Sequence, residues 1–108
     1  MMNWQDDPTA LHIIRIIARL GRSSPHLVAR PQRDLKRSHL RYVVWHYMRL
    51  LGYTCTDIAK MFSCSTANVS KGVTWVHYNR VCEPYRSIML HADPVCNYVV
   101  TTDGRSVA

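Results

Sequence analysis

Helix start signals recur along this 108-residue chain and divide its apolar residues into segments of helical period. A capping side chain followed directly by proline occurs at Asp7-Pro8, Ser24-Pro25 and Asp93-Pro94. Proline fits the first turn of a helix because that turn has no internal acceptor for its N–H. Between these signals, apolar residues recur every three or four positions. The pattern predicts an all-α domain of five to six helices.

The start and stop signals also predict where the individual elements lie. The expected helices cover about 8–20, 25–29, 34–51, two short segments within 54–80, and 84–91. Gly21 and Gly52 are expected to end the first and third of these helices. Residues 95–101 follow Asp93-Pro94 and are not assigned by periodicity. We therefore expect one domain over residues 1–101, with a C-terminal extension at 84–101 and a tail at 102–108.

The stretch YTCTDIAKMFSCSTANVSKGV, residues 53–73, predicts two short helices joined by a tight corner. Thr54 and Asp57 have the spacing of a capping box, and Ser63-Cys64-Ser65 interrupts the first helix. Ala59 is small enough for a second helix to cross the first at that point. Gly72 lowers helix stability, so its presence indicates a close packing contact. The pair is typical of a helix-turn-helix, whose second helix enters a DNA major groove.

Short polar side chains occupy the start of the second helix of this pair. Asparagine pairs with adenine edges, hydroxyl groups suit several bases and phosphates, and lysine suits guanine or phosphate. A corner used only for packing carries Glu, Lys and Gln more often. The residues expected to contact the major groove are Ser65, Thr66, Asn68, Ser70 and Lys71.

Positive charge is concentrated ahead of the same pair. The formal net charge is +7, and residues 15–49 hold nine Lys or Arg but a single acid, Asp34. Basic residues at the start of the 34–51 helix oppose the helix dipole, which points to a binding role rather than to helix stability. Double-stranded DNA is the expected partner, and a solvated surface is the simpler alternative. Contacts to phosphates or a minor groove are expected from Arg30, Arg33, Lys36, Arg37 and Arg41.

Residues from about 10 to 80 resemble the C-terminal DNA-binding domain of the bacterial replication initiator DnaA, a Trp-repressor-like helix-turn-helix class. The stretches that carry the resemblance are IIRIIARLGRSSPHLVARPQR, DLKRSHLRYVVWHYMRLLGYTCTDIAKMF and STANVSKGV. It implies that Arg33, Lys36 and Arg37 form or adjoin a basic loop. It also implies that Ser65, Thr66, Asn68 and Lys71 take the base-reading positions. The family's G-G-R-D-H run is replaced by Ser63-Cys64-Ser65, and its nucleotide-binding G-x-x-x-x-G-K-[ST] motif is absent from this sequence.

Other functional classes receive little support from the residues. The seven acidic residues are dispersed and form no paired-carboxylate or Ser-His-Asp pattern, so we expect no catalytic residues. The four cysteines form no C-x-x-C pair, so neither a metal site nor a cofactor is expected. Residues 1–7 lack the features of a signal peptide, and no apolar stretch has the length of a membrane span. The expected compartment is the bacterial cytoplasm, or the host cytoplasm for a phage-encoded protein.

Two alternatives to DNA recognition remain open at this level. The fold could serve a protein-interaction or phage-assembly module, for example one that inhibits a host protein. It could also belong to a small terminase-like packaging subunit, which would form an oligomeric ring. Residues 84–101 are the candidate surface for a homo-oligomer or a protein partner.

Overall fold

The computed structural model describes residues 3–31 and 34–102, with side chains described up to residue 95, and every regular element in this part is helical. The all-α class is therefore confirmed. The elements are the short 3-10 helix η1 (Trp4–Asp6) and the α-helices α1 (Pro8–Leu20), α2 (Pro25–Ala29), α3 (Leu35–Leu50), α4 (Cys55–Phe62), α5 (Thr66–Asn79) and α6 (Tyr85–Thr102). The sequence pattern did not predict η1.

The helices begin where the capping residues predict. Asp7, Ser24, Asp34, Thr54 and Ser65 each occupy the N-cap of the helix that follows, and each side chain accepts a backbone N–H of the first turn. Thr54 and Asp57 form the expected reciprocal capping box. These interactions satisfy amide groups that have no partner inside the helix.

The last helix departs from the sequence prediction. A helix from Pro84 to about His91 was expected, followed by a new start at Asp93-Pro94, whereas α6 runs without a break from Tyr85 to Thr102 and contains Pro94. Proline in a helix removes one N–H donor and its ring needs space near the preceding turn. Pro94 is exposed, so its ring lies at the surface rather than in the core. The Asp93-Pro94 pair, a capping residue followed by proline, therefore does not begin a new helix.

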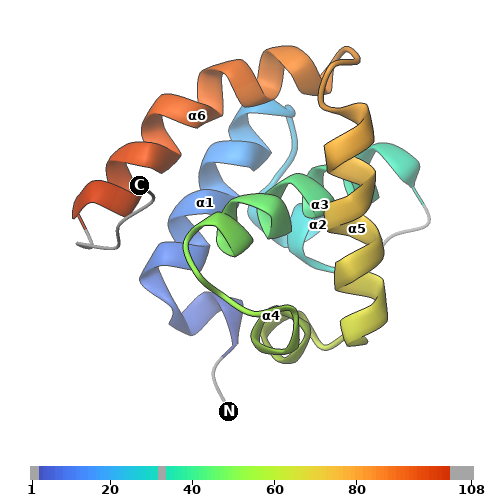
Figure 1. Ribbon diagram of the computed structural model, residues 1–108, viewed down its shortest axis with the longest axis vertical. Helices are drawn as coiled ribbons and strands as arrows, with labels where there is room; N and C mark the ends of the chain where they lie inside the picture. The colour runs from blue at the N-terminus through green and yellow to red at the C-terminus, as the bar shows by residue number, and fades with distance from the viewer. Residues whose placement is uncertain (1–2, 32–33, 103–108) are drawn as a thin grey trace.

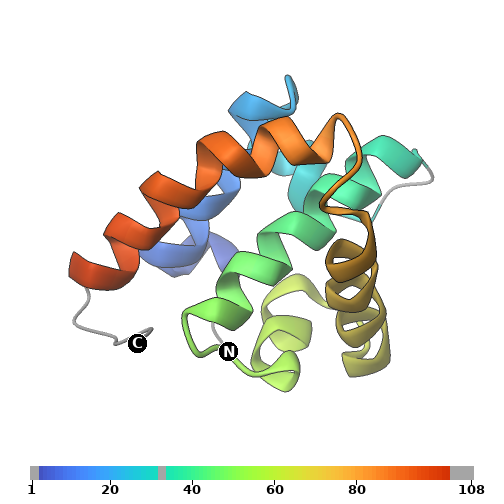
Figure 2. The same ribbon diagram turned by 45° about the horizontal axis from the view of Figure 1, so that its top comes forward.

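Helix α3 lies in the middle of the molecule, and the other helices pack around it. It contacts α1 and α2 on one side and α4 and α5 on the other, while α6 packs along α1 (Figure 1). The turned view separates α6 from the α4–α5 pair, which lies at the opposite side of α3 (Figure 2). The α4–α5 pair is thus held by the core through α3.

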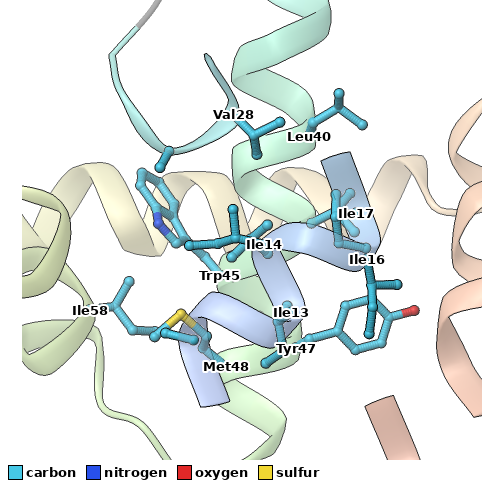
Figure 3. Packing of buried hydrophobic residues seen from close by; sticks show 14 of the residues in the cluster. Ile13, Ile14, Ile16, Ile17, Val28, Leu40, Trp45, Tyr47, Met48 and Ile58 are labelled. Atoms are coloured by element: carbon cyan, nitrogen blue, oxygen red, sulfur yellow. The ribbon is translucent and has the colours of Figure 1, made fainter. Parts of the chain in front are cut away.

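The core is built from the apolar faces that the helical period predicts. Ile13, Ile14 and Ile17 of α1 pack against Trp45 and Met48 of α3 (Figure 3), and all five side chains are fully buried. Burying large aliphatic and aromatic side chains is the main favourable contribution to folding. The aromatic residues of α3 thus form part of the interior.

Helix α5 approaches α3 closely at Gly72. A Cβ atom at this position would lie 2.5 Å from Cδ1 of Tyr42 and 2.9 Å from Cε3 of Trp45. These distances are shorter than any normal carbon–carbon contact, so only glycine fits without rearrangement. The close contact expected at Gly72 is present, and it fixes the position of α5 on α3.

Candidate nucleic-acid interface

Helices α4 and α5 are joined by the three residues Ser63, Cys64 and Ser65. Ser63 takes the left-handed conformation, with φ of 56°, and ends α4. The Cys64 N–H then donates to the carbonyl of Ala59 at 3.0 Å, which closes the corner. The turn is therefore ordered by backbone hydrogen bonds.

One face of α5 is buried and the other is exposed. Val69, Gly72 and Val76 follow each other at helical spacing and are buried against the rest of the molecule. The remaining positions of the first two turns lie on the surface. We define the α5 outer face by the residues expected to contact a major groove, Ser65, Thr66, Asn68, Ser70 and Lys71.

The members of the α5 outer face are not equally accessible. Thr66, Ser70 and Lys71 are exposed, whereas Asn68 is half-buried. Ser65 is also exposed, but its hydroxyl oxygen accepts the Asn68 N–H at 3.1 Å as the helix cap. Ala67 is exposed on the same face and was not among the expected contacts. Three long or hydroxyl side chains of the face are thus available to a ligand.

The basic residues near the start of α3 are partly accessible. Arg30 and Lys36 are exposed, and Arg37 is half-buried. Arg37 forms an ion pair with Asp34 at 3.8 Å, across one turn of the helix. Arg33 lies outside the described residues. Arg30, Lys36 and Arg37 therefore leave three positive charges at or near the surface.

The start of α3 and the α5 outer face do not form one cluster. His39 stacks on Trp75 with ring centroids 3.9 Å apart and planes at 16°, so the N-terminal part of α3 lies beside the C-terminal half of α5. Trp75 is about 15 Å along the helix axis from Ser65, at 1.5 Å per residue. Lys71, at the other end of the α5 outer face, is about 6 Å from Trp75 by the same rise, so the two groups are separated by about 6–15 Å along α5.

Arg41 differs from the other basic residues because it is buried, with 5% of its surface exposed. Its Cζ atom lies 4.9 Å from the ring centroid of Trp45, one turn later on α3. Burial lowers the pKa of the Arg41 guanidinium, and the nearby Cys64 and Tyr42 side chains oppose that shift. The spacing of Arg41, Trp45 and Met48 places the arginine on the apolar stripe of α3, and this signal was overlooked in the sequence.

A second surface feature lies at the corner between α5 and α6. Val81 is 73% exposed and Leu90 is 68% exposed, and they line the same groove. The other residues lining it are Arg80, Arg86, Met89 and Asp93. This groove coincides with the start of the segment 84–101 that the sequence indicates for a partner.

Searches of the described residues for two other kinds of site gave negative results. No group of three or more His, Cys, Asp or Glu side chains in this part of the chain is arranged to hold a metal ion. Nor does any helix there combine the length and the apolar character needed to cross a membrane.

Comparisons with known proteins leave the family open. No protein-family model matches the chain, and neither a curated protein nor a solved structure matches it. The resemblance to the initiator's DNA-binding domain therefore rests on the sequence stretches alone. Function has to be argued from the residues and their arrangement.

Proposed function

We propose that this protein binds double-stranded DNA and regulates transcription or replication, with α4 and α5 acting as a helix-turn-helix. The observation that carries the proposal is the α5 outer face: an exposed, polar helix start without any acidic residue, fixed to the core by Gly72. Side chains of this type donate and accept hydrogen bonds at base edges and phosphate oxygens. A rigidly held helix can present them in one register.

The charge distribution of the protein also supports double-stranded DNA as the partner. A net charge of +7 attracts a polyanion, and α5 contains no Asp or Glu to repel it. The N-terminal end of a helix also favours anions through its unpaired amide groups. Phosphates close to Ser65 and Thr66 would therefore be stabilised while α5 lies in the groove.

The basic residues of α3 supply a second contact region. With the α5 outer face in a major groove, the start of α3 would lie about 6–15 Å away along α5. Lys36 and Arg30 are exposed there and would contact the sugar-phosphate backbone next to that groove. These contacts would set affinity, and the α5 outer face would set sequence preference.

Selection of bound duplexes from a random pool tests the proposal directly. We expect enrichment of a short motif and binding that weakens steeply with salt, because bound phosphates release counterions. Equal recovery of all sequences together with salt-independent retention would contradict the proposal.

Two pairs of substitutions separate the roles of the two regions. Lys36→Ala with Arg30→Ala should lower the slope of log affinity against log salt by about 2, at about 0.9 per phosphate contact, for any duplex. Arg15→Ala with Arg19→Ala removes the same charge from exposed positions of α1 and should leave the slope nearly unchanged. Asn68→Ala with Lys71→Ala should make the selected DNA motif less specific. Thr74→Ala, on the next exposed turn of α5, is the control and should leave the motif unchanged.

The groove at the α5–α6 corner favours one competing function, a protein-interaction module. Exposed aliphatic side chains such as Val81 and Leu90 are typical of surfaces covered by a partner. Under this alternative, Leu90→Glu would abolish a self-associated or partner-bound form seen in solution, and no duplex would be enriched. Under the DNA-binding proposal, Leu90→Glu leaves the selected motif unchanged.

A further inference from the structure

Unpaired donors are concentrated at one place in the interior. Within the described residues, the buried side-chain polar atoms without a hydrogen-bond partner are Ser23 Oγ, Arg41 Nε, Arg41 Nη1 and Trp45 Nε1. Three of these atoms are N–H donors, and they belong to two side chains in contact, since Arg41 Cζ lies 4.9 Å from the Trp45 ring centroid. Buried donors are nearly always paired in folded proteins. Arg41 and Trp45 thus carry buried donors without an acceptor among the described protein groups.

The donors lie beneath the corner between α4 and α5. Trp45 meets Phe62, the last residue of α4, edge to face at 5.9 Å, and it also touches α5 at Gly72. Figure 3 shows the Trp45 indole within the core cluster, between α1 and the α4–α5 side of the molecule. Arg41 reaches toward the corner, because its guanidinium lies over a ring one turn further along α3.

Cys64 lies in the corner itself and interacts electrostatically with Arg41. Burial raises the pKa of the Cys64 thiol, and the Arg41 guanidinium partly opposes that shift. Directly after the corner comes the first turn of α5. Its Asn68 N–H is taken by Ser65, whereas the amide groups of Thr66 and Ala67 precede the first internal hydrogen bonds of the helix. Cys64 thus lies between the start of α5 and a buried guanidinium with two unpaired nitrogens.

The chemistry of these donors identifies the class of ligand. A guanidinium has only donors, and its fork matches the paired oxygens of an oxyanion. The helix start favours negative charge at the same place. Phosphate offers enough acceptor oxygens for all of them.

We propose that Arg41 forms a binding site for one phosphate-type oxyanion together with the start of α5, and that a DNA backbone phosphate is its ligand. The second half of this statement rests on the proposed function. Because Arg41 is 5% exposed, binding requires its guanidinium to move outward from the Trp45 ring toward the first turn of α5. The long side chain allows this movement.

A test without DNA examines the site itself. Thermal unfolding of the full chain is measured in inorganic phosphate and in sodium chloride at the same ionic strength. The wild-type Tm should rise in phosphate relative to chloride, since a ligand of the folded state stabilises it. Arg41→Met should remove that rise, and Arg19→Met should keep it. In chloride, Arg41→Met should unfold at the same temperature as the wild type or higher, because the unpaired buried charge is gone.

A second test uses duplex DNA. Arg41→Met should lower the slope of log affinity against log salt by about 0.9, the value for one phosphate contact, and weaken binding to all sequences alike. Arg41→Lys keeps the charge without the fork, so it should retain most of the slope with lower affinity. Arg41→Lys also serves in both tests should Arg41→Met fail to fold.

The possible outcomes separate the two proposals. If phosphate raises the Tm through Arg41 but no duplex binds, the oxyanion site stands with free phosphate as its ligand, and the DNA-binding function fails. If duplexes bind while the Tm and the salt slope do not depend on Arg41, the site is wrong and the function survives. Equal Tm in phosphate and chloride, as expected for donors hydrated by water or paired with a carboxylate, overturns the site.

Discussion

Asp7 and Tyr53 are joined by a hydrogen bond of 2.8 Å, from the tyrosine hydroxyl to Oδ2 of the carboxylate, across 46 residues of sequence. The other oxygen, Oδ1, accepts the N–H groups of Thr9 and Ala10 at 2.9 and 3.2 Å. One half-enclosed carboxylate thus caps α1 and also holds the connection between α3 and α4. The position of the α4–α5 pair depends in part on this link.

Replacement of Asp7 by alanine is therefore expected to be more costly than loss of an ordinary cap. A cap contributes about 1 kcal/mol, and a hydrogen bond to a charged group contributes about 1.5–3 kcal/mol. We expect Asp7→Ala to lower the free energy of unfolding by about 3 kcal/mol in urea titrations. Asn3→Ala, at the exposed cap of η1, is the control and should cost less than about 1 kcal/mol. Equal losses for Asp7→Ala and Asn3→Ala would show that the Tyr53 bond contributes nothing.

The second prediction concerns Gly72→Ala, which has two effects of opposite sign on the free energy of unfolding. Alanine normally stabilises a helix interior over glycine by about 1 kcal/mol. The added Cβ would collide with Tyr42 and Trp45, and overpacking of a core costs about 1–3 kcal/mol. We expect the collision to dominate, so that Gly72→Ala lowers the free energy of unfolding by about 1 kcal/mol.

The control for Gly72 is Thr74→Ala, two residues later on the exposed side of α5. This change should alter stability by less than about 0.5 kcal/mol. Urea titration of both variants, with DNA binding measured in parallel, checks the prediction. A more stable Gly72→Ala variant would mean that α5 is able to shift on α3.

The helix starts were predictable because capping is local: Asp7, Ser24 and Thr54 lie within three residues of the amides they bind. The continuity of α6 was not predictable, because the sequence signal at Asp93-Pro94 is also compatible with an exposed proline inside a helix. The exposed face of α5 followed from the spacing of Val69 and Val76. The distance between this face and the start of α3 did not follow from the sequence, because the packing of α3 against α5 sets that distance.

Tyr47 links α3 to α6 and gives a third prediction. Its hydroxyl donates to the Asp93 carboxylate, and the carbonyl of Met89 lies 3.3 Å from the same oxygen. Removing a hydrogen bond to a charged acceptor costs about 1.5–3 kcal/mol. Tyr47→Phe should therefore lower the free energy of unfolding by about 2 kcal/mol, whereas Tyr78→Phe, at a hydroxyl that is exposed, should have almost no effect. Similar values for the two variants, measured by urea titration, would refute a stabilising link at Asp93.

The stability of the fold should decrease when the solution becomes mildly acidic. Burial lowers the pKa of His39, whose Nδ1 lies 2.9 Å from the Tyr85 hydroxyl. Burial also lowers the pKa of His46, assisted by the positive charge of Arg80 and opposed by Asp93. Both histidines are thus neutral in the folded state at pH values where the unfolded chain, with a pKa of about 6.5, already takes up protons.

Because the unfolded state then binds more protons, stability is retained above about pH 7 and declines as the pH falls through about 6.5. We expect a lower Tm at pH 5 than at pH 7.5. His39→Asn combined with His46→Gln should be less stable at pH 7.5 but should flatten this dependence, since the titrating groups are gone. The exposed His12→Gln is the matched control and should preserve the slope. An unchanged slope in the double variant would assign the pH dependence to other groups.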